Sequence, residues 1–325
     1  MRVRHSGRAL AGLVVVASWL TACGGGVRSQ EPEVGLADPG TPLGEGMMVP
    51  QESHLVGAVF AETSTDGEVR STRSVLRVEG DPFVMWDGLA YQARQAGAPL
   101  PSSGICAWYD VVAGGTGAPP AAPVLVSQPK PDGADLLWCS GSASGGGPEG
   151  EQVAVTADLV WSAAGAEVGL RVTSGGPALP AHQFPSPDPG PAPGGTAALL
   201  PAIDERPSPR PGEPFGEETN CAEAGYTRLR MPDRAELATP GRTVLEGDLA
   251  AVLSVSDAHA ALEDLAAQLD PTGPDAGEGS ATIERIDAGY GRVWHLTASV
   301  GAGGGSCEAW TSPDGTSILI TMHND

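Results

Sequence analysis

The sequence is poor in basic residues. It contains 18 lysines and arginines against 40 aspartates and glutamates, which gives a formal charge of −22 at pH 7. Lys130 is the only lysine. A protein that binds the phosphate backbone of nucleic acids needs clustered positive charge. We therefore expect no nucleic-acid partner.

Long apolar runs and metal-binding spacings are also missing. The one notable apolar run, Ala9–Leu20, is too short to cross a bilayer comfortably, so a multi-span membrane protein is excluded. There is no Cys-x-x-Cys, and no two histidines lie within seven residues of each other. A zinc site is therefore not expected. The 46 glycines have no three-residue period, which excludes a collagen-like chain.

The chain contains no recognisable catalytic motif. Residues 141–145 read Gly-Ser-Ala-Ser-Gly, which puts alanine at the nucleophile position of a Gly-x-Ser-x-Gly elbow. We assign no catalytic residue and no cofactor, although a triad assembled from distant residues stays open because triads follow geometry rather than chain order. A structural or solvated role is favoured for each remaining histidine. These are His54, His182, His259, His295 and His323.

The N-terminus carries the most specific signal. Arg2, Arg4 and Arg8 precede the apolar run, and Leu20-Thr21-Ala22-Cys23 follows it, with three glycines directly after. This arrangement resembles a bacterial lipoprotein signal peptide with its lipobox. The resemblance implies removal of residues 1–22 and a diacylglycerol, carrying acyl chains such as palmitate, on Cys23. Such a protein is anchored to the cell membrane at its extracytoplasmic face. An ordinary cleaved secretory signal is the alternative, and it also implies export.

Four cysteines remain if Cys23 is lipidated. An even number in an oxidising compartment predicts two disulfides, for which three pairings exist. We favour Cys106–Cys139 and Cys221–Cys307, because a proline-rich segment separates the two pairs.

Composition divides the mature chain into four parts. Residues 23–49 are rich in glycine, proline and acids, and predict a flexible tether. Residues 176–217 hold twelve of the 30 prolines and predict a semi-rigid linker. Two small domains remain, at 50–175 and 218–325, each long enough to hold a core.

Apolar patterning predicts the same elements in both domains. Asp81 and Pro82 begin a helix that Gly97 ends, and hairpins surround it. In the second domain Ser256 or Asp257 caps a helix that Pro271 ends. We therefore expect the α+β class, with two domains that each combine an antiparallel sheet and one main helix.

A faint similarity joins the two domains. Residues 106–108 (Cys-Ala-Trp) precede a Pro-Asp-Gly turn at 131–133, and residues 307–310 (Cys-Glu-Ala-Trp) precede another at 313–315. A duplicated unit and a coincidence of turn chemistry both explain it.

The sequence-based hypothesis for function is a membrane-anchored lipoprotein that acts as a binding or accessory module of the cell envelope. Its expected partners are the membrane, through Cys23, and another envelope protein. The alternatives are an envelope hydrolase whose active site follows no motif and a lipoprotein that binds a small ligand. Whether the chain is an enzyme stays open, with the non-enzymatic hypothesis preferred.

Overall fold

In the computed structural model, Val34–Asp325 form one compact body. The structure describes residues 36–64, 67–101, 106–109, 124–125, 136–148, 150–162, 165–177, 209–215, 229–239, 243–246, 248–269, 280–287, 292–300 and 305–323.

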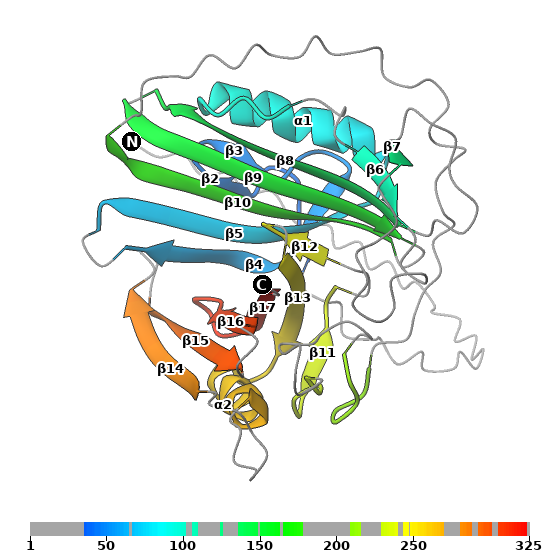
Figure 1. The fold of residues 1–325 in the computed structure, drawn as a ribbon, viewed down its shortest axis with the longest axis vertical. Coiled ribbons are helices and arrows are strands. Elements are labelled where there is room, and N and C mark those ends of the chain that lie inside the picture. The colour runs from blue at the N-terminus through cyan, green and yellow to red at the C-terminus, as the bar shows by residue number, and fades with distance from the viewer. Residues whose placement is uncertain are drawn as a thin grey trace, which may run out of the picture. The chain divides into compact units, whose positions relative to one another are not determined.

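An antiparallel sheet of eight strands forms the first half of the fold (Figure 1). Its strands, in spatial order, are β1 (Leu36–Ala37), β4 (Ser53–Thr63), β5 (Val69–Val78), β10 (Gly165–Pro177), β9 (Glu151–Ser162), β8 (Leu136–Gly146), β6 (Cys106–Tyr109) and β7 (Val124–Leu125). Helix α1 (Pro82–Gln95) packs on one face through Met85, Trp86 and Leu89, all almost fully buried. Asp81 caps this helix, because its side chain accepts a hydrogen bond from the backbone N of Phe83 at 2.9 Å.

A second antiparallel sheet, of seven strands, follows. Its spatial order is β11 (Ala235–Leu237), β13 (Asp248–Val255), β17 (Ser317–His323), β16 (Gly305–Thr311), β15 (Arg292–Val300) and β14 (Ser280–Asp287), and β12 (Thr243–Leu245) also pairs with β13. Helix α2 (Ala258–Leu269) buries Leu262, Leu265 and Leu269 against this sheet. Asp257 accepts a hydrogen bond from the backbone N of Ala260 at 3.1 Å, so both helices begin at an aspartate.

The expected α+β class is wrong. The described residues are mostly strand and form three sheets, with only the two helices. Strands β4, β8, β9 and β10 run for 11 to 13 residues each, far beyond the short alternating segments that the sequence reveals. Strand β8 is an example, because its Gly- and Ser-rich half has weak strand propensity and is held by the pairing of β8 with β9.

The segment expected to be a tether also folds in part. Residues 42–48 form the two-stranded sheet of β2 (Pro42–Gly44) and β3 (Met47–Met48). Leu43, Met47 and Val49 are buried in the same core as α1. The folded part therefore begins no later than β1, because β1 pairs with β4 and the residues after it pack in the first core.

The two sheets repeat one topology. In the first, β5 is followed by α1, β6, β8, β9 and β10, and the strands lie in the order β5-β10-β9-β8-β6; the two-residue β7, inserted between β6 and β8, adds an edge strand beyond β6. In the second, β13 is followed by α2, β14, β15, β16 and β17, and the strands lie in the order β13-β17-β16-β15-β14. The preceding strands match as well, because β4 pairs with β5 as β11 and β12 pair with β13. The fold is thus built from two similar units.

The repeated topology does not follow the sequence similarity noted above. Cys106 and its neighbours lie in β6, whose topological counterpart is β14. Cys307 and Trp310 lie in β16, whose counterpart is β9. The two cysteine–tryptophan motifs therefore occupy unrelated positions in the two units.

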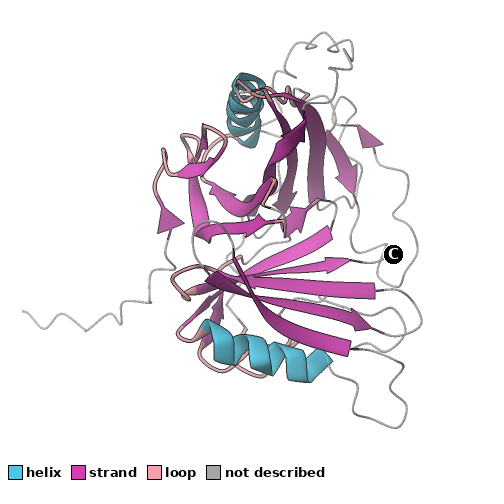
Figure 2. Cartoon of the chain, turned by 90° about the vertical axis from the view of Figure 1, so that its left-hand side faces the viewer, coloured by secondary structure: helices cyan, strands magenta, loops and turns pink. Residues whose placement is uncertain are grey.

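An apolar cluster joins the two sheets. Val56, Phe60 and Val75 of the first sheet pack against residues of the second, and the helices lie on the outer faces (Figure 2). The members from the second sheet and its flanking segment are Ala238, Leu245, Ala250, Val252, Trp310 and Leu319. The predicted linker lies mostly outside the described residues, and the sheets before and after it share this cluster.

Gly57 lies at a close approach of the two sheets. It lies at a bulge in β4 with a φ of 72°, and a Cβ there would lie 2.9 Å from Val252 Cγ1 and 3.0 Å from Ser317 Oγ. We expect Gly57→Val to lower the free energy of unfolding by about 3 kcal/mol, since backbone strain and overpacking add. Urea denaturation measures this. Gly46→Val is the control, because Gly46 has a φ of 74° and nothing within 4 Å, so only the strain applies. If both variants lost the same free energy of unfolding, the close approach of the two sheets at Gly57 would be contradicted.

Candidate functional site: a polar cluster between the sheets

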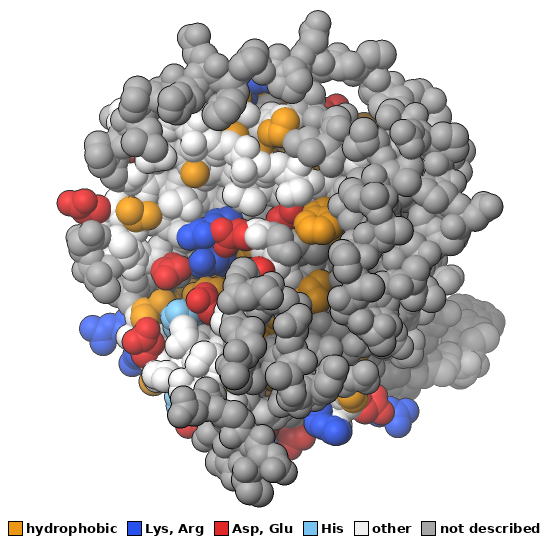
Figure 3. Space-filling model, in the orientation of Figure 1, with side chains coloured by type: hydrophobic (Ala, Val, Ile, Leu, Met, Phe, Trp, Pro, Cys, Tyr) orange, Lys and Arg blue, Asp and Glu red, His pale blue; other side chains and the backbone are white. Residues whose placement is uncertain are grey.

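Charged and aromatic side chains gather where the two sheets meet. The pairing of β5 with β10 sets Arg73 directly opposite Arg171. Arg73 shares its strand face with Val75, which belongs to the inter-sheet apolar cluster, so both arginines lie on the face turned towards the second sheet. Figure 3 shows basic and acidic side chains together near the middle of one face. We call the following set the junction cluster: Glu62, Arg73, Arg171, Glu246, His295, Glu308 and Trp310.

Two glutamates neutralise the arginines. Arg73 Nη1 donates a hydrogen bond to Glu62 Oε2 at 2.7 Å, and Arg73 Nε lies 3.6 Å from Glu246 Oε2. The other oxygen of Glu246 accepts a hydrogen bond from Arg171, whose Nε also donates to Ser71 Oγ at 2.8 Å. Arg73 is 7% exposed, whereas the side chains of Arg171 and Glu246 are each 30% exposed. The carboxylate of Glu246 therefore bridges the two arginines at the solvent side of the cluster.

Trp310 forms the aromatic centre of the cluster. The guanidinium carbon of Arg73 lies 4.3 Å from the centroid of the indole ring, a cation–π contact. The His295 ring stacks on the same indole with centroids 5.0 Å apart and an interplanar angle of 13°. A cation from the first sheet and an imidazole from the second thus contact one tryptophan.

Two carboxylates flank His295. Its Nδ1 lies 3.8 Å from Glu284 Oε1, and its Nε2 lies 3.8 Å from Glu308 Oε2. The polar contact with His295 lowers the pKa of Glu308, while burial opposes this and the charges of His295, Arg73 and Arg171 assist it. Glu308 therefore stays ionised to lower pH than an ordinary glutamate does.

This lowered pKa predicts a pH-dependent contribution to stability. A carboxyl group whose pKa falls on folding stabilises the native state above its ordinary pKa and loses that effect as the pH falls. We expect Glu308→Gln to weaken the decline of unfolding free energy between about pH 5 and pH 3. Chemical denaturation across this range measures it. Glu263→Gln is the control, because Glu263 lies 3.8 Å from His259 in an exposed i,i+4 pair on α2. An unchanged pH profile for Glu308→Gln would reject the role.

Three buried nitrogen atoms of the cluster lack a hydrogen-bond partner in the described part of the chain. They are Arg73 Nε, His295 Nε2 and Trp310 Nε1. Trp310 and His295 are 2% and 8% exposed, so water does not reach these atoms freely. Buried polar atoms without a partner are rare in folded proteins. Three such nitrogen atoms lie in or beside the Trp310 indole ring. This distinguishes the junction cluster from an ordinary salt-bridge network.

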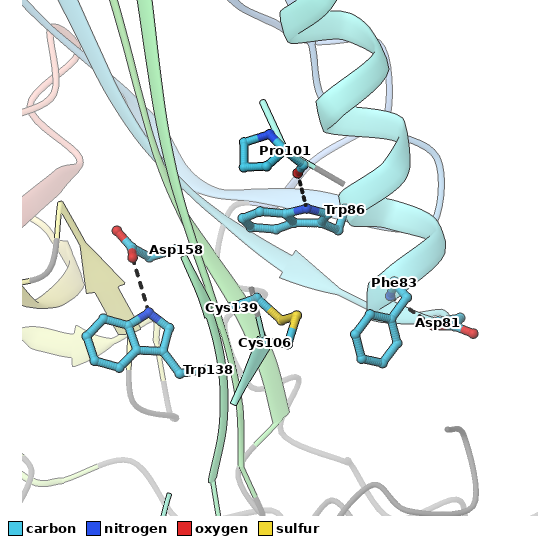
Figure 4. The surroundings of a disulfide bond; sticks show 8 residues. All are labelled: Asp81, Phe83, Trp86, Pro101, Cys106, Trp138, Cys139 and Asp158. Atoms are coloured by element: carbon cyan, nitrogen blue, oxygen red, sulfur yellow. Dashed lines mark hydrogen bonds between the residues drawn. A yellow bond between two sulfur atoms is a disulfide. The ribbon is translucent and has the colours of Figure 1, made fainter. Parts of the chain in front are cut away.

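A similar pair of side chains in the first unit is joined by a direct hydrogen bond. Trp138 pairs with Val160, two residues from Asp158, just as His295 pairs with Trp310, two residues from Glu308, so both pairs stand diagonally across neighbouring strands. Trp138 Nε1 donates a hydrogen bond to Asp158 Oδ1 at 3.1 Å (Figure 4). A ring nitrogen beside a carboxylate thus recurs in both units, with a direct hydrogen bond only in the first.

Two hollows adjoin the hairpin of β2 and β3, and only the smaller has a wall in the junction cluster. The larger, about 340 Å³, is lined mainly by Leu43, Met47, Met48 and Val59. The smaller, about 230 Å³, includes Glu62 and Ser71 among its walls. The hairpin of β2 and β3 contributes Gly44 and Glu45 to both. The smaller hollow therefore reaches side chains that contact the two arginines.

The cysteines predicted to form disulfides are described in part. Cys106 and Cys139 are joined in a disulfide, at directly opposite positions of β6 and β8. Figure 4 shows it on the α1 side of the sheet with Trp86, whereas Trp138 lies on the opposite side. Cys307 is also disulfide-bonded. Cys23 and Cys221 lie outside the described residues, so the lipidation and the second pairing stay predictions.

The histidines have separate surroundings. His54 lies 3.1 Å from Glu79 and 3.9 Å from Asp38, and His259 contacts Trp294 with ring centroids 4.2 Å apart. His182 and the side chain of His323 lie outside the described residues. Sequence reasoning named His295 only as one of five histidines with a favoured structural or solvated role, and it missed Arg73, Arg171 and Glu246. Only the charged positions within apolar strands hinted at the arginines.

The described residues contain no group of three or more His, Cys, Asp or Glu side chains placed to hold a metal ion. Neither described helix is long and apolar enough to cross a membrane. Compared with known proteins, the chain matches no protein-family model and no curated sequence.

Proposed function

We propose that this chain is an exported lipoprotein that acts as a binding or accessory module of the cell envelope. The observation that carries the proposal is the N-terminal sequence, in which three arginines, an apolar run and Leu20-Thr21-Ala22-Cys23 follow one another. A diacylglycerol group on Cys23 would hold the protein at the extracytoplasmic face of the membrane, because two acyl chains give stable anchoring. The Cys106–Cys139 disulfide supports an oxidising compartment.

Mass spectrometry of the N-terminal peptide tests the anchor. We expect a mature chain that begins at Cys23 and carries the mass of a diacylglycerol, and a membrane fraction that loses the protein in the Cys23→Ala variant. A mature chain that begins elsewhere, without lipid, would reject the anchor and leave an ordinary secreted protein.

Cross-linking of intact cells tests the accessory role. A partner protein that co-purifies with the lipidated form, and is lost in the Cys23→Ala variant, would support an accessory subunit near a membrane assembly. Turnover of a substrate by the purified protein, with no partner recovered, would instead favour the hydrolase.

Binding of a small ligand is a second candidate, and the junction cluster favours it. Arg171 and Glu246 are partly exposed, and behind them lie buried nitrogen atoms without partners. Such atoms in a partly accessible polar cluster are a reasonable place for ligand recognition, where a few convergent polar groups provide specificity.

A further inference from the structure

The unpartnered nitrogen atoms define the chemistry that the junction cluster can recognise. Arg73 Nε and Trp310 Nε1 carry hydrogens and can only donate hydrogen bonds. His295 Nε2 donates as well whenever the imidazolium form is present. Arg73 and His295 both contact the indole ring that carries Trp310 Nε1, and Arg171, opposite Arg73, adds a partly exposed guanidinium. A group rich in acceptor oxygens is the natural complement to this set.

Glu246 shows that a carboxylate fits beside the two arginines. It accepts a hydrogen bond from Arg171, but its second oxygen lies 3.6 Å from Arg73 Nε, beyond hydrogen-bond range. The pairing of Leu245 with Asp248 makes Glu246 the first residue of a two-residue hairpin turn. Glu246 thus hydrogen-bonds to Arg171 and interacts with Arg73 only through charge.

The backbone at Glu246 supports a role beyond closing a hairpin. Its φ is 59°, in the left-handed region that glycine, asparagine and aspartate favour in such turns. A glutamate at this position gains no advantage from the turn itself. Strained residues of this kind are often kept for what their side chain does. Here the side chain reaches the arginine pair formed by β5 and β10.

We propose that the junction cluster binds the carboxylate group of a ligand, and that Glu246 is the internal carboxylate that this group replaces. A free carboxylate is not held by a hairpin, so it can approach both guanidinium groups in the bidentate geometry that arginine favours. The proposal deepens the small-ligand binding function above and does not depend on the lipid anchor.

The acidic character of the chain limits affinity without preventing binding. At physiological salt, charges more than about 8 Å away are largely screened, so the nearby groups dominate. Glu62 remains paired with Arg73 Nη1, and Glu308 remains beside His295. When Glu246 leaves, Arg171 loses its counter-charge, and a ligand carboxylate restores it. Competition with Glu246 predicts weak binding in the natural chain and tighter binding once Glu246 is neutral.

An NMR titration with acetate as the probe tests the proposal. The mature chain is labelled with ¹⁵N, and the indole N–H signal of Trp310 is assigned by its loss in Trp310→Phe. Sodium acetate replaces sodium chloride at constant ionic strength. We expect a saturable shift of the Trp310 signal, and in Glu246→Gln a dissociation constant at least about tenfold lower, because the internal competitor is gone.

Arg171→Gln is the loss-of-binding variant, and Arg285→Gln is its matched control. Arg285 lies 5.6 Å from the centroid of Trp294, which also contacts His259, so the control removes an arginine from a similar Arg–Trp–His group. We expect Arg171→Gln to weaken acetate binding at least tenfold and Arg285→Gln to leave it unchanged. Arg171 is only partly buried, so this variant should keep the fold, which the remaining indole signals report.

Three results would overturn the proposal. A Trp310 signal that responds alike to acetate and chloride would reject the site. An acetate affinity that does not change in Glu246→Gln would reject the replacement of Glu246. Saturation by inorganic phosphate without saturation by acetate would reject the carboxylate assignment. A lipidated Cys23 together with any of these results would leave the anchor intact and remove only the binding site.

Discussion

Replacement of Trp310 by alanine should lower the free energy of unfolding by about 4 kcal/mol. The side chain is 2% exposed and packs in the apolar cluster shared by the two sheets. It also carries the cation–π contact with Arg73 and the stacked ring of His295. The variant therefore creates a cavity at the point where both units meet and leaves the buried Arg73 without its aromatic support.

Two controls separate these effects. Trp310→Phe keeps an aromatic ring and most of the volume, so we expect a loss of only about 1–2 kcal/mol. Trp294→Ala removes the other tryptophan of β15 and β16, which is half-buried and packs on the α2 side of the sheet. Guanidinium denaturation followed by far-UV circular dichroism measures all three. If Trp310→Ala were no more destabilising than Trp294→Ala, the shared cluster would not hold the sheets together.

Removal of the Cys106–Cys139 disulfide should lower the free energy of unfolding by a similar amount. The bridge closes a loop of 33 residues, for which the chain-entropy model gives about 4 kcal/mol. Both cysteines are about 2% exposed or less, so replacement by serine would add the cost of two buried hydroxyl groups. The double variant Cys106→Ala/Cys139→Ala isolates the cross-link, because alanine leaves no polar group behind.

Thermal unfolding of the double variant measures this prediction. Chemical reduction of the natural chain is a poorer test, because Cys307 is also disulfide-bonded and would be reduced as well. The single variant Cys139→Ala provides the comparison, since it opens the same loop and leaves one free thiol. A double variant as stable as the natural chain would mean that strand pairing of β6 with β8 already restricts this segment in the unfolded state.

The helices were predictable from the sequence because their signals are local. Asp81, Pro82 and Gly97 predict the first helix, and α1 runs from Pro82 to Gln95. The apolar spacing of Leu262, Leu265 and Leu269 predicts the second, and α2 ends at Leu269. Caps and periodic apolar positions lie within a few turns of each other, so they need no tertiary information.

The fold class and the lengths of the strands could not be predicted from local signals of this kind. Residues 141–146 of β8 are glycine, serine and alanine, which carry little strand propensity of their own. Their place in the sheet depends on β9, which supplies a partner along the whole of β8. Such long-range pairing overrides local preference, and this is why a mostly β fold was mistaken for an α+β one.

The junction cluster depends on contacts across the whole chain. Arg73 and Arg171 are 98 positions apart and meet only because β5 pairs with β10. Glu246 joins them from a third segment, and Trp310 and His295 from two more. The alternation in β5 shows that Arg73 and Arg77 share one face, but no local pattern shows that a second sheet covers it.

The early start of the fold limits how far the protein can reach. If Cys23 carries the lipid, twelve residues separate it from Leu36, where β1 begins. A fully extended connection of this length spans about 45 Å. The protein would then sample a hemisphere above the bilayer in which its effective concentration towards a neighbour fixed in the same membrane is on the order of millimolar. At that concentration, even weak recognition would keep such a neighbour bound for much of the time.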